Sequence, residues 1–519
     1  MGSRDGILRS LRDEPLFWDI IVIGGGATGL GAAVDAAARG YRTILLEQSD
    51  FSKGTSSRST KLIHGGVRYL QQGNVRLVLE ALRERGTLLH NAPHLVHNIP
   101  FIVPNYDWWE GPFYGTGLKI YDMLSGRFGL GPSTHISRRE TLQRIPTLEP
   151  GGLRGGILYH DAQFDDARLV INLAQTLADL GGIPVNYMQV TQLLKAKGCV
   201  GGVVARDVEG GEAFEIRGRV VVNATGVFSD SILRMDEPGV PESIAPSQGV
   251  HIVLEKSFLP SESAVMVPHT RDGRVLFALP WHDRVIVGTT DTPVAEVSLE
   301  PRPLREEIDF LLTHAARYLT RDPSDSDVLS TFAGLRPLVK TGHVLDTASL
   351  SREHAVHVSG SGLVTITGGK WTTYRKMGED VINRAAEVAG LEARRPGTAQ
   401  LRIHGWLKHE TDVYPWDVYG TDIVGLKKIA VENPAWAETL HPGLFYRGCE
   451  VIWAARREWA RTVEDVLARR TRALFLDARA SMEAAPAVAR LLAEELGRDP
   501  SWEAEQVRNY LELAAGYLT

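Results

Sequence analysis

Three glycines near the start of the chain have the spacing of a dinucleotide-binding loop. Gly24, Gly26 and Gly29 form G-x-G-x-x-G. The first glycine permits a tight turn, the second lets backbone approach a pyrophosphate, and the third lets a helix pack on a strand. Glu47 follows about 20 residues later, where a carboxylate can accept hydrogen bonds from ribose hydroxyls of FAD or NAD rather than from a 2′-phosphate.

A β-α-β unit is needed to position these residues. Residues 19–23 are apolar and β-branched, which predicts a buried parallel strand. Residues 28–39 are rich in alanine and predict a helix whose positive N-terminal end points at the pyrophosphate. Gly40 ends this helix, and residues 43–46 predict the next strand. Together with the terminal acid, these elements indicate a complete unit rather than an isolated loop.

Composition limits the classes of protein that fit. The chain has 519 residues, 43% of them hydrophobic and 23% charged, which predicts a globular protein with two or three domains. Its net charge of -6 gives no support for nucleic-acid binding. Its two cysteines, Cys199 and Cys449, form neither a disulfide framework nor a C-x-x-C motif. We therefore expect a reducing cytoplasm and no metal site.

Membrane contact has only weak signals. No apolar run reaches the roughly 18 residues that a spanning helix needs, and residues 1–15 lack the apolar core of a signal peptide. Apolar and arginine residues between 4 and 12 could form an amphipathic turn at a membrane, although a frayed tail is the preferred interpretation. Trp108 and Trp109 could mark a membrane or partner face if they are exposed.

A loop rich in hydroxyl residues follows the β-α-β unit and reads TSSRSTKLIHGGVRYL over residues 55–70. The hydroxyl groups of Thr55, Ser56 and Ser57 can donate hydrogen bonds to phosphate oxygens at short range. Gly65 and Gly66 would let backbone pass close to a flat ring.

This string resembles the FAD-dependent glycerol-3-phosphate dehydrogenases, whose usual pattern is TSS-x-SSKLIHGGLRYL. The chain departs from it with Thr60 in place of serine and Val67 in place of leucine, and both changes keep the chemistry of the position. The resemblance implies roles around the flavin and substrate for Lys61, His64, Arg68 and Tyr69. His64 is expected to orient the flavin loop, and Tyr69 to form part of the pocket wall.

A second glycine element favours flavin over nicotinamide. The predicted strand 219–222 runs into Asn223, Ala224, Thr225 and Gly226, which are small enough to let backbone touch a dinucleotide. In folds with two such contacts, this element resembles the one that closes over FAD. Because it lies far along the chain from the first, we expect a discontinuous FAD-binding domain.

Short strands with intervening turns over residues 246–286 predict an antiparallel sheet that binds the substrate. His251 lies inside one of these strands, where a histidine is more often a hydrogen-bonded core residue than a catalyst. The family resemblance changes this balance, because its G-S-H-I-V segment, here residues 249–253, places a histidine at the active site. Val250 replaces the serine of that segment.

Two later motifs, residues 334–338 (GLRPL) and 368–375 (GGKWTTYR), resemble the family's GVRPL and GGKLTTYR. A helix from Thr372 onward, preceded by Gly369, could aim its amides at the flavin's pyrimidine end, where negative charge gathers on reduction. These motifs thus restore flavin-binding character after the predicted substrate sheet.

Four cations, Arg68, Arg336, Arg352 and Lys370, could bind a phosphate monoester, which carries nearly two negative charges. Most of them lie near glycine-rich turns rather than in charged runs. The resemblance implies that Arg336 and Arg352 hold the substrate phosphate, and that Lys370 and Arg68 contact substrate or flavin.

Residues 399–519 have helical periodicity and predict a separate domain. Residues 462–465 are expected to cap one helix that continues through Leu476. The sequence from 462 to 480, TVEDVLARRTRALFLDARA, resembles the helical C-terminal cap of the bacterial family members. We expect a solvated arginine face here, formed by Arg456, Arg457, Arg461, Arg469, Arg470 and Arg472.

The predicted fold is α/β, with a discontinuous FAD-binding Rossmann-like domain, an antiparallel-sheet substrate domain and a C-terminal helical domain. The predicted limits are 17–80, 160–245 and 330–398 for the first, 81–159 and 246–329 for the second, and 399–519 for the third. The predicted cofactor-binding residues are Gly24, Gly26, Thr28, Gly29, Glu47, Thr55, Ser56, Ser57, Lys61, His64, Gly65, Gly66, Ala224, Thr225, Gly226, Gly334, Gly369, Lys370 and Thr372.

The resemblance implies oxidation of sn-glycerol 3-phosphate to dihydroxyacetone phosphate, with hydride transfer to N5 of FAD. His251 is the candidate base, and Arg336 and Lys370 are the other candidate catalytic residues. The expected partners are a membrane quinone, the membrane surface, and a second copy of the chain in a homodimer. The expected location is cytoplasmic, peripheral on the inner membrane face.

Other functions remain open from the sequence. Within flavoenzymes, the alternatives are a glycerol-3-phosphate oxidase that uses oxygen and an oxidase of the amino-acid oxidase type. An NAD-binding dehydrogenase would share the first unit but would lack the yellow colour of a flavin. A non-catalytic flavin-binding or membrane-scaffold protein would not have its flavin bleached by glycerol 3-phosphate.

Overall fold

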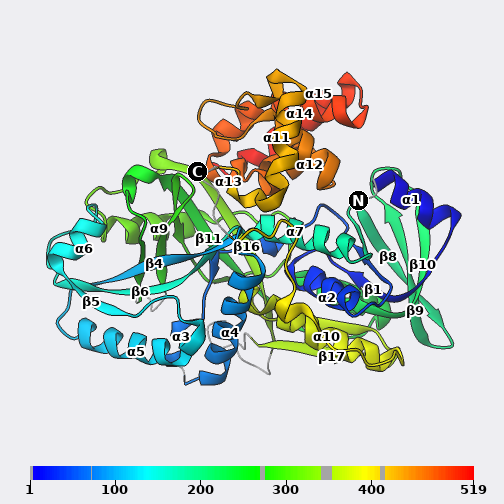
Figure 1. Ribbon diagram of the computed structural model, residues 1–519, viewed down its shortest axis with the longest axis horizontal. Helices are drawn as coiled ribbons and strands as arrows, with labels where there is room; N and C mark the ends of the chain where they lie inside the picture. Colours follow the sequence, from blue (N-terminus) through cyan, green and yellow to red (C-terminus); the bar gives the residue numbers. More distant parts are fainter. Residues whose placement is uncertain (1–3, 72, 269–274, 341–352, 409–414) are drawn as a thin grey trace.

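The computed structural model describes residues 4–71, 73–268, 275–340, 353–408 and 415–519. Two β-sheets lie side by side, and C-terminal helices, coloured orange to red in Figure 1, lie above their junction. The predicted fold class, an α/β protein with a Rossmann-like part, a second sheet and a C-terminal helical part, is confirmed.

The elements of each layer come from several parts of the chain. The first sheet contains β1 (Phe17–Ile23), β2 (Thr43–Leu46), β7 (Ile183–Val185), β8 (Met188–Ala196), β9 (Cys199–Asp207), β10 (Ala213–Asn223), β17 (His354–Val358) and β18 (Val364–Gly368). The second sheet contains β3 (Leu62–Ile63), β4 (Val96–Asn105), β5 (Thr134–Ser137), β6 (Gly155–Phe164), β11 (Ile244–Glu255), β12 (Ala264–Val267), β13 (Leu276–Trp281), β14 (Arg284–Gly288), β15 (Thr292–Pro293) and β16 (Val328–Val339). The α-helices are α1 (Arg4–Asp13), α2 (Ala27–Ala38), α3 (Val67–Gln71), α4 (Val75–Asn91), α5 (Glu110–Ser125), α6 (Arg138–Arg144), α7 (Asp166–Asp179), α8 (Ser229–Asp236), α9 (Arg305–Ala316), α10 (Tyr374–Val388), α11 (Ile423–Glu432), α12 (Gly448–Arg457), α13 (Ala473–Leu476), α14 (Ala478–Leu496) and α15 (Pro500–Ala515).

The first sheet has a parallel centre that is covered on both faces. β1 pairs in parallel with β2 on one side and with β10 on the other, and β10 pairs in parallel with β18. Ile20 and Val22 share a core with α2, α7 and α10, whereas Ile21 and Ile23 share a second core with β8, β9 and α8. Because successive side chains point to opposite faces, burial on both faces explains why β1 is apolar throughout.

The second sheet is organised around β11. β14 and β16 both pair with it in the antiparallel sense, as predicted for this region. The long ladder with β16 places Arg336 opposite Ser247 and Phe332 opposite His251. One pairing in this sheet, between β4 and β12, is parallel.

The N-terminal segment is a helix, so the preferred prediction of a frayed tail is wrong. Leu8 of α1 is buried in the same core as Ile21 and Ile23. The side chain of Arg4 is only 4% exposed and forms an ion pair with Asp207 at the end of β9. Burial of one apolar side chain and one paired arginine holds α1 against the first sheet.

The expectation of a fully solvated arginine face in the C-terminal part is also wrong. Arg456 and Arg457 are exposed, but Arg469, Arg470 and Arg472 are buried. A π-helix, Asp465–Arg470, precedes a left-handed residue at Arg472, with a φ of 66°, so the predicted single helix is broken before α13. The buried guanidinium groups pair with carboxylates that lie far away in sequence, and sequence-local patterning could not reveal those partners.

Asp50 receives two of these arginines. Its carboxylate accepts hydrogen bonds from Arg469 Nε at 2.6 Å and from Arg470 Nη1 at 2.6 Å. Burial opposes ionisation, yet Arg470 and Arg469 hold the pKa of the Asp50 carboxyl below its ordinary value. This cluster joins the loop after β2 to the C-terminal part.

Among the described residues, no helix combines the length and apolarity needed to cross a membrane.

The Asp50 cluster predicts a large loss of stability on partial removal. Asp50→Asn leaves two buried guanidinium groups without their counter-charge, and we expect the free energy of unfolding to fall by about 3–5 kcal/mol. Because the folded-state pKa is depressed, this stabilisation should be present above the unfolded pKa of about 3.9 and lost as pH falls through the folded-state pKa. Urea unfolding at several pH values would measure both effects.

The matched control is Glu212→Gln, which removes the carboxylate of the exposed ion pair with Arg12. This pair is open to solvent and should change the urea midpoint little. Equal destabilisation by both substitutions would contradict the larger contribution to the free energy of unfolding that we expect from the buried cluster.

Candidate dinucleotide and substrate site

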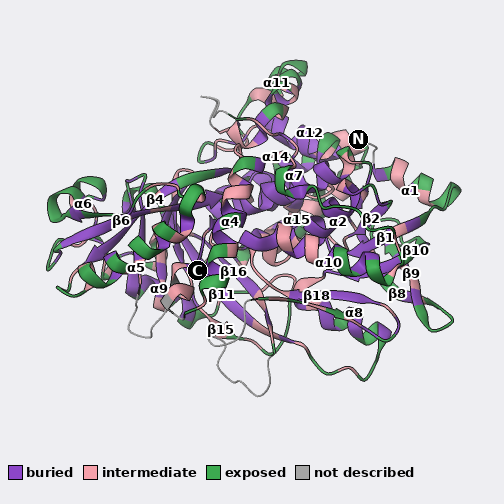
Figure 2. Ribbon diagram, turned by 60° about the horizontal axis from the view of Figure 1, so that its bottom comes forward, coloured by how far each residue is buried: buried purple, intermediate pink, exposed green. Residues whose placement is uncertain are grey.

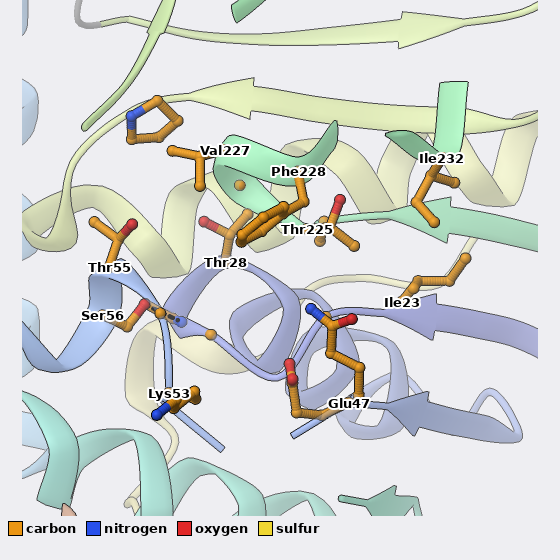
Figure 3. A pocket seen from close by; sticks show the side chains of 18 of the residues that line it. Ile23, Thr28, Glu47, Lys53, Thr55, Ser56, Thr225, Val227, Phe228 and Ile232 are labelled. Carbon is orange, nitrogen blue, oxygen red and sulfur yellow. Dashed lines mark hydrogen bonds between the residues drawn. The ribbon is translucent and has the colours of Figure 1, made fainter. Parts of the chain in front are cut away.

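A cavity of about 460 Å³ opens where the parallel strands β1, β10 and β18 end. The carboxyl ends of parallel strands are where open α/β sheets bind ligands. Figure 3 shows the side chains of Thr28, Glu47, Thr55 and Ser56 around this hollow. The predicted cofactor residues that line it are Gly24, Gly26, Thr28, Glu47, Thr55, Ser56, Ala224, Thr225, Gly226, Gly369 and Lys370.

Two glycines of the fingerprint are required by close backbone contacts. Gly24 has a φ of 111°, and a Cβ there would lie 2.6 Å from the carbonyl oxygen of Ala224. A Cβ on Gly29 would lie 1.9 Å from the carbonyl oxygen of Gly24. These contacts keep side chains out of the cavity floor, so a dinucleotide pyrophosphate can lie directly against backbone. The residues present therefore fit FAD.

The start of α2 is arranged to hold an anion. Gly26 is the N-cap residue and has no side chain that could cap the helix. Ser56 Oγ accepts a hydrogen bond from Ala27 N at 2.9 Å, drawn as a dashed line in Figure 3. The first-turn amides and the positive end of the helix dipole therefore lie at the cavity, where they would stabilise a phosphate.

Glu47 lies at the end of β2 and lines the same cavity. Its carboxylate accepts hydrogen bonds from Gly25 N at 2.6 Å and from Ser49 N at 2.8 Å. Burial raises the pKa of the Glu47 carboxyl, although both amides oppose this shift. Glu47 thus holds the glycine loop in place while it faces the position predicted for a ribose.

Other predicted cofactor residues do not line this cavity. Lys61 is completely buried, and its Nζ donates to Asp166 Oδ2 at 2.6 Å and to the carbonyl oxygen of Ser57 at 2.8 Å. Gly334 packs against Arg58, whose Cβ would lie 3.0 Å from a Cβ at that glycine. The predicted residues outside the cavity lining are Gly29, Ser57, Lys61, His64, Gly65, Gly66, Gly334 and Thr372.

His251 is buried in β11 beside the loop that follows the fingerprint. Its Nε2 lies 2.9 Å from Thr60 Oγ1, and its ring stacks on Phe332 with centroids 4.7 Å apart. Burial, with contributions from the charges of Lys61 and Arg336, lowers the pKa of His251 well below its ordinary value. The imidazole is therefore neutral at physiological pH.

Arg336 lies on the same face of the second sheet as His251. Gly249 and His251 are two residues apart on β11, so their Cβ directions point to one face. Arg336 Nη2 occupies that face, 2.3 Å from where a Cβ of Gly249 would lie. The guanidinium forms an ion pair with Asp291 at 3.2 Å and donates to the carbonyl oxygen of Thr290 at 2.9 Å.

The remaining predicted cations are placed differently. Lys370 lines the cavity, and its Nζ lies 3.6 Å from the ring centroid of Tyr69. Arg68 belongs to α3, but its side chain is not described, and Arg352 lies outside the described residues. Arg336 itself does not line the cavity, but Pro337, directly after it on β16, does. Lys370 lies just after the end of β18, at the start of the 3₁₀ turn Trp371–Thr373.

Sequence reasoning missed part of the cavity wall. Residues 188–190 of β8, together with Phe228, Ile232 and Leu299, contribute apolar surface, but no motif marks them in the sequence. Lys53 also lines the cavity and could have been found, because it is a cation between Glu47 and the hydroxyl-rich loop.

Comparison with known proteins gives matches over the whole length. Residues 19–375 match the family model described as FAD dependent oxidoreductase, and residues 365–506 match the C-terminal domain of alpha-glycerophosphate oxidase. The mitochondrial glycerol-3-phosphate dehydrogenase of Mus musculus is 40% identical over 551 residues, which cover 99% of this chain and 75% of that protein. The Schizosaccharomyces pombe protein of the same name is 36% identical over 579 residues, which cover 98% and 89%.

A solved structure is similar over the same extent. The X-ray structure of the glycerol-3-phosphate dehydrogenase from Bacillus halodurans complexed with FAD superposes with a TM-score of 0.82. The two chains are 28% identical, and the match covers 100% of this chain and 99% of that one.

The glycine contacts predict the effect of adding one methyl group to the loop. In Gly29→Ala the new Cβ would meet backbone at 1.9 Å, so α2 must move away from β1 and the first-turn amides must leave the pyrophosphate position. We expect FAD to bind at least about tenfold more weakly, which corresponds to about 1.4 kcal/mol. Flavin fluorescence during titration of the apoprotein would measure this change.

Gly117→Ala is the matched control, because a Cβ on that helical glycine of α5 would meet no atom of the described residues within 4 Å. The control should bind FAD as the unchanged protein does. Unchanged FAD affinity in Gly29→Ala would contradict the role given to this loop.

Proposed function

The chain belongs to the family of FAD-dependent glycerol-3-phosphate dehydrogenases, and from this premise we propose that it oxidises sn-glycerol 3-phosphate to dihydroxyacetone phosphate. The resemblance inferred from the sequence motifs is confirmed by relatives that match 99% of the chain. When bound, FAD supplies the acceptor for the hydride of the carbinol carbon. The observation in this chain that carries the proposal is the presence of a neutral histidine on β11 and an arginine on β16 on one face of the second sheet.

His251 suits the role of general base. Oxidation of an alcohol requires removal of the hydroxyl proton, and a neutral imidazole can take it. Its pKa is lowered by burial and by nearby positive charge, so the ring stays unprotonated before substrate binds. Thr60 and Phe332 hold the ring in position, which keeps the proton acceptor aligned with the substrate.

Arg336 suits the substrate phosphate. Its planar guanidinium can bind phosphate oxygens with two parallel hydrogen bonds. Asp291 holds it at 3.2 Å and orients it on the face shared with His251. Lys370, on the cavity wall, would provide a second positive charge near the same end of the site. Binding the phosphate away from the reacting carbon would orient the carbinol hydrogen toward the flavin.

The proposed electron acceptor is a membrane quinone, which requires contact with a lipid surface. Exposed apolar side chains form a strip along α5 and the turn that precedes it. Figure 2 colours much of α5 as exposed. Trp108 is 75% exposed, Phe113 54% and Met123 80%. An apolar strip that begins with tryptophan is typical of a surface that enters the interface of a bilayer. This strip supports a peripheral membrane location.

Anaerobic spectroscopy tests the reaction and the phosphate contact together. We expect sn-glycerol 3-phosphate to bleach the flavin absorbance and yield dihydroxyacetone phosphate. Arg336→Ala should raise KM for this substrate by roughly tenfold to 100-fold, because a charge-assisted contact is worth about 1.5–3 kcal/mol. Steady-state kinetics with a quinone analogue would measure this change.

Glycerol, which lacks the phosphate, is the internal control, and its weak turnover should be nearly the same in both proteins. A flavin that stays oxidised with glycerol 3-phosphate would refute the proposed reaction. An equal effect of Arg336→Ala on both substrates would refute only the phosphate contact. Faster oxidation of the reduced flavin by oxygen than by the quinone analogue would favour an oxidase.

The apolar strip predicts lipid binding. Replacing Phe113 and Met123 together with serine should reduce co-sedimentation with liposomes at least about tenfold, because each side chain contributes about 1.5–3 kcal/mol when it is buried. Val431→Ser, at an equally exposed position on α11, is the control and should bind like the unchanged protein.

Two results would contradict the lipid assignment. Unchanged co-sedimentation of the double variant would show that the strip does not contact lipid. Loss of a dimer in sedimentation velocity, without loss of lipid binding, would instead assign the strip to an interface between two copies of the chain.

A further inference from the structure

Lys53 lies on the wall of the dinucleotide cavity, but its ammonium group is held by two carboxylates from other parts of the chain. Its Nζ donates to Glu300 Oε2 at 2.8 Å and to Glu464 Oε1 at 2.5 Å. Glu300 precedes α9, and Glu464 directly precedes the π-helix. Lys53 therefore joins three segments that are separated by hundreds of residues.

Glu300 accepts hydrogen bonds from other side chains besides Lys53. Its carboxylate also accepts hydrogen bonds from Arg58 Nη2 at 2.9 Å and from the Tyr517 hydroxyl at 2.6 Å. Burial opposes ionisation, yet Arg58 and Lys53 lower the pKa of the Glu300 carboxyl, so it carries its charge at neutral pH. Leu299, the preceding residue, lines the cavity.

The segment that contains Glu464 holds the loop at a second point. Arg469 pairs with Glu464 and also with Asp50, where its Nε lies 2.6 Å from Oδ2. Asp50, Lys53 and Arg58 all belong to the loop 47–58, which follows β2 and includes the 3₁₀ turn Thr55–Ser57. The loop is thus bound to the C-terminal part through Asp50 and Lys53, and to Glu300 through Lys53 and Arg58.

The same loop forms one side of the cofactor cavity. Its lining residues are Gln48, Ser52, Lys53, Gly54, Thr55 and Ser56. Ser56 caps the first turn of α2 at the predicted pyrophosphate position. Any movement of the loop would therefore displace both the cavity wall and the group that contacts the fingerprint helix.

We propose that Lys53, Glu300 and Glu464 form a clamp through which the C-terminal helical part holds this loop in its cofactor-binding conformation. Lys53 is a positioning residue in this clamp, and Glu300 and Glu464 act on FAD through it without lining the cavity. The inference uses only the FAD-binding part of the proposed function and is independent of the substrate.

Two features favour a clamp over a direct contact between Lys53 and the phosphates of FAD. The ammonium group already donates to two carboxylates, which occupy two of its three N–H donors. The side chains of Lys53, Glu300 and Glu464 are only 11%, 19% and 21% exposed, so solvent screens their attraction less than it screens a surface ion pair.

The rate at which FAD leaves the full-length holoprotein tests the clamp. Flavin fluorescence recovers as FAD dissociates, which gives the rate without any turnover of substrate. We expect Lys53→Met, Glu300→Gln and Glu464→Gln each to release FAD roughly tenfold faster, since tenfold corresponds to about 1.4 kcal/mol. The double variant Lys53→Met with Glu464→Gln should release FAD more slowly than the product of the two single effects predicts, because both substitutions break the contact between Lys53 and Glu464. Lys53→Arg, which keeps the charge, should restore slow release.

The matched control is Lys256→Met, which removes a lysine from an exposed pair with Glu262. It should release FAD at the rate of the unchanged protein. Faster release from Lys53→Met but not from Glu300→Gln or Glu464→Gln would show that Lys53 contacts FAD directly and would overturn the clamp. Unchanged release in all three variants would also overturn it. If Lys53→Met does not fold, the two isosteric glutamine variants alone decide between these outcomes.

Discussion

The close approach of two backbone segments at the ends of β1 and β10 is the constraint on which the site depends. Parallel pairing places Ile23 beside Asn223 and brings the glycine loop into contact with Ala224. These segments are separated by some 200 residues, so one contact joins distant parts of the chain around a single cavity. A side chain at Gly24 would push these segments apart, and one at Gly29 would push α2 away from Gly24. Either change would disturb the space for a pyrophosphate.

Buried ion pairs also connect distant parts of the chain. Arginines of the segment 465–472 reach the carboxylates of Asp50, in the loop after β2, and of Asp166, at the start of α7. A buried ion pair contributes little net stability relative to a packed apolar core, but breaking one is strongly destabilising. Such pairs therefore specify which surfaces meet, and here they hold the C-terminal helices against the loop beside the dinucleotide cavity.

The two sheets carry different chemical groups. The first sheet provides helix amides, backbone and hydroxyl groups that suit a phosphate-bearing cofactor. The second sheet provides a buried imidazole and a guanidinium on one face. In the proposed reaction, FAD held by the first sheet would accept the hydride, and His251 of the second sheet would accept the proton. β16 connects the two parts, because Pro337, directly after Arg336, lines the cavity.

Local sequence patterns were enough to predict the first β-α-β unit, the family and the cofactor, because the chemistry of the fingerprint and of the hydroxyl-rich loop depends on neighbouring residues. The mixed strands of the second sheet and the helices of the C-terminal part were also predictable from periodicity. The limits of the three domains stay a prediction.

Contacts between distant residues could not be read from local patterns. The sequence did not reveal that Arg469, Arg470 and Arg472 are buried, that Lys61 pairs with Asp166, or that residues 188–190 line the cavity. These features depend on the folded chain, because a charged side chain is solvated or buried according to whether a partner from elsewhere in the chain reaches it.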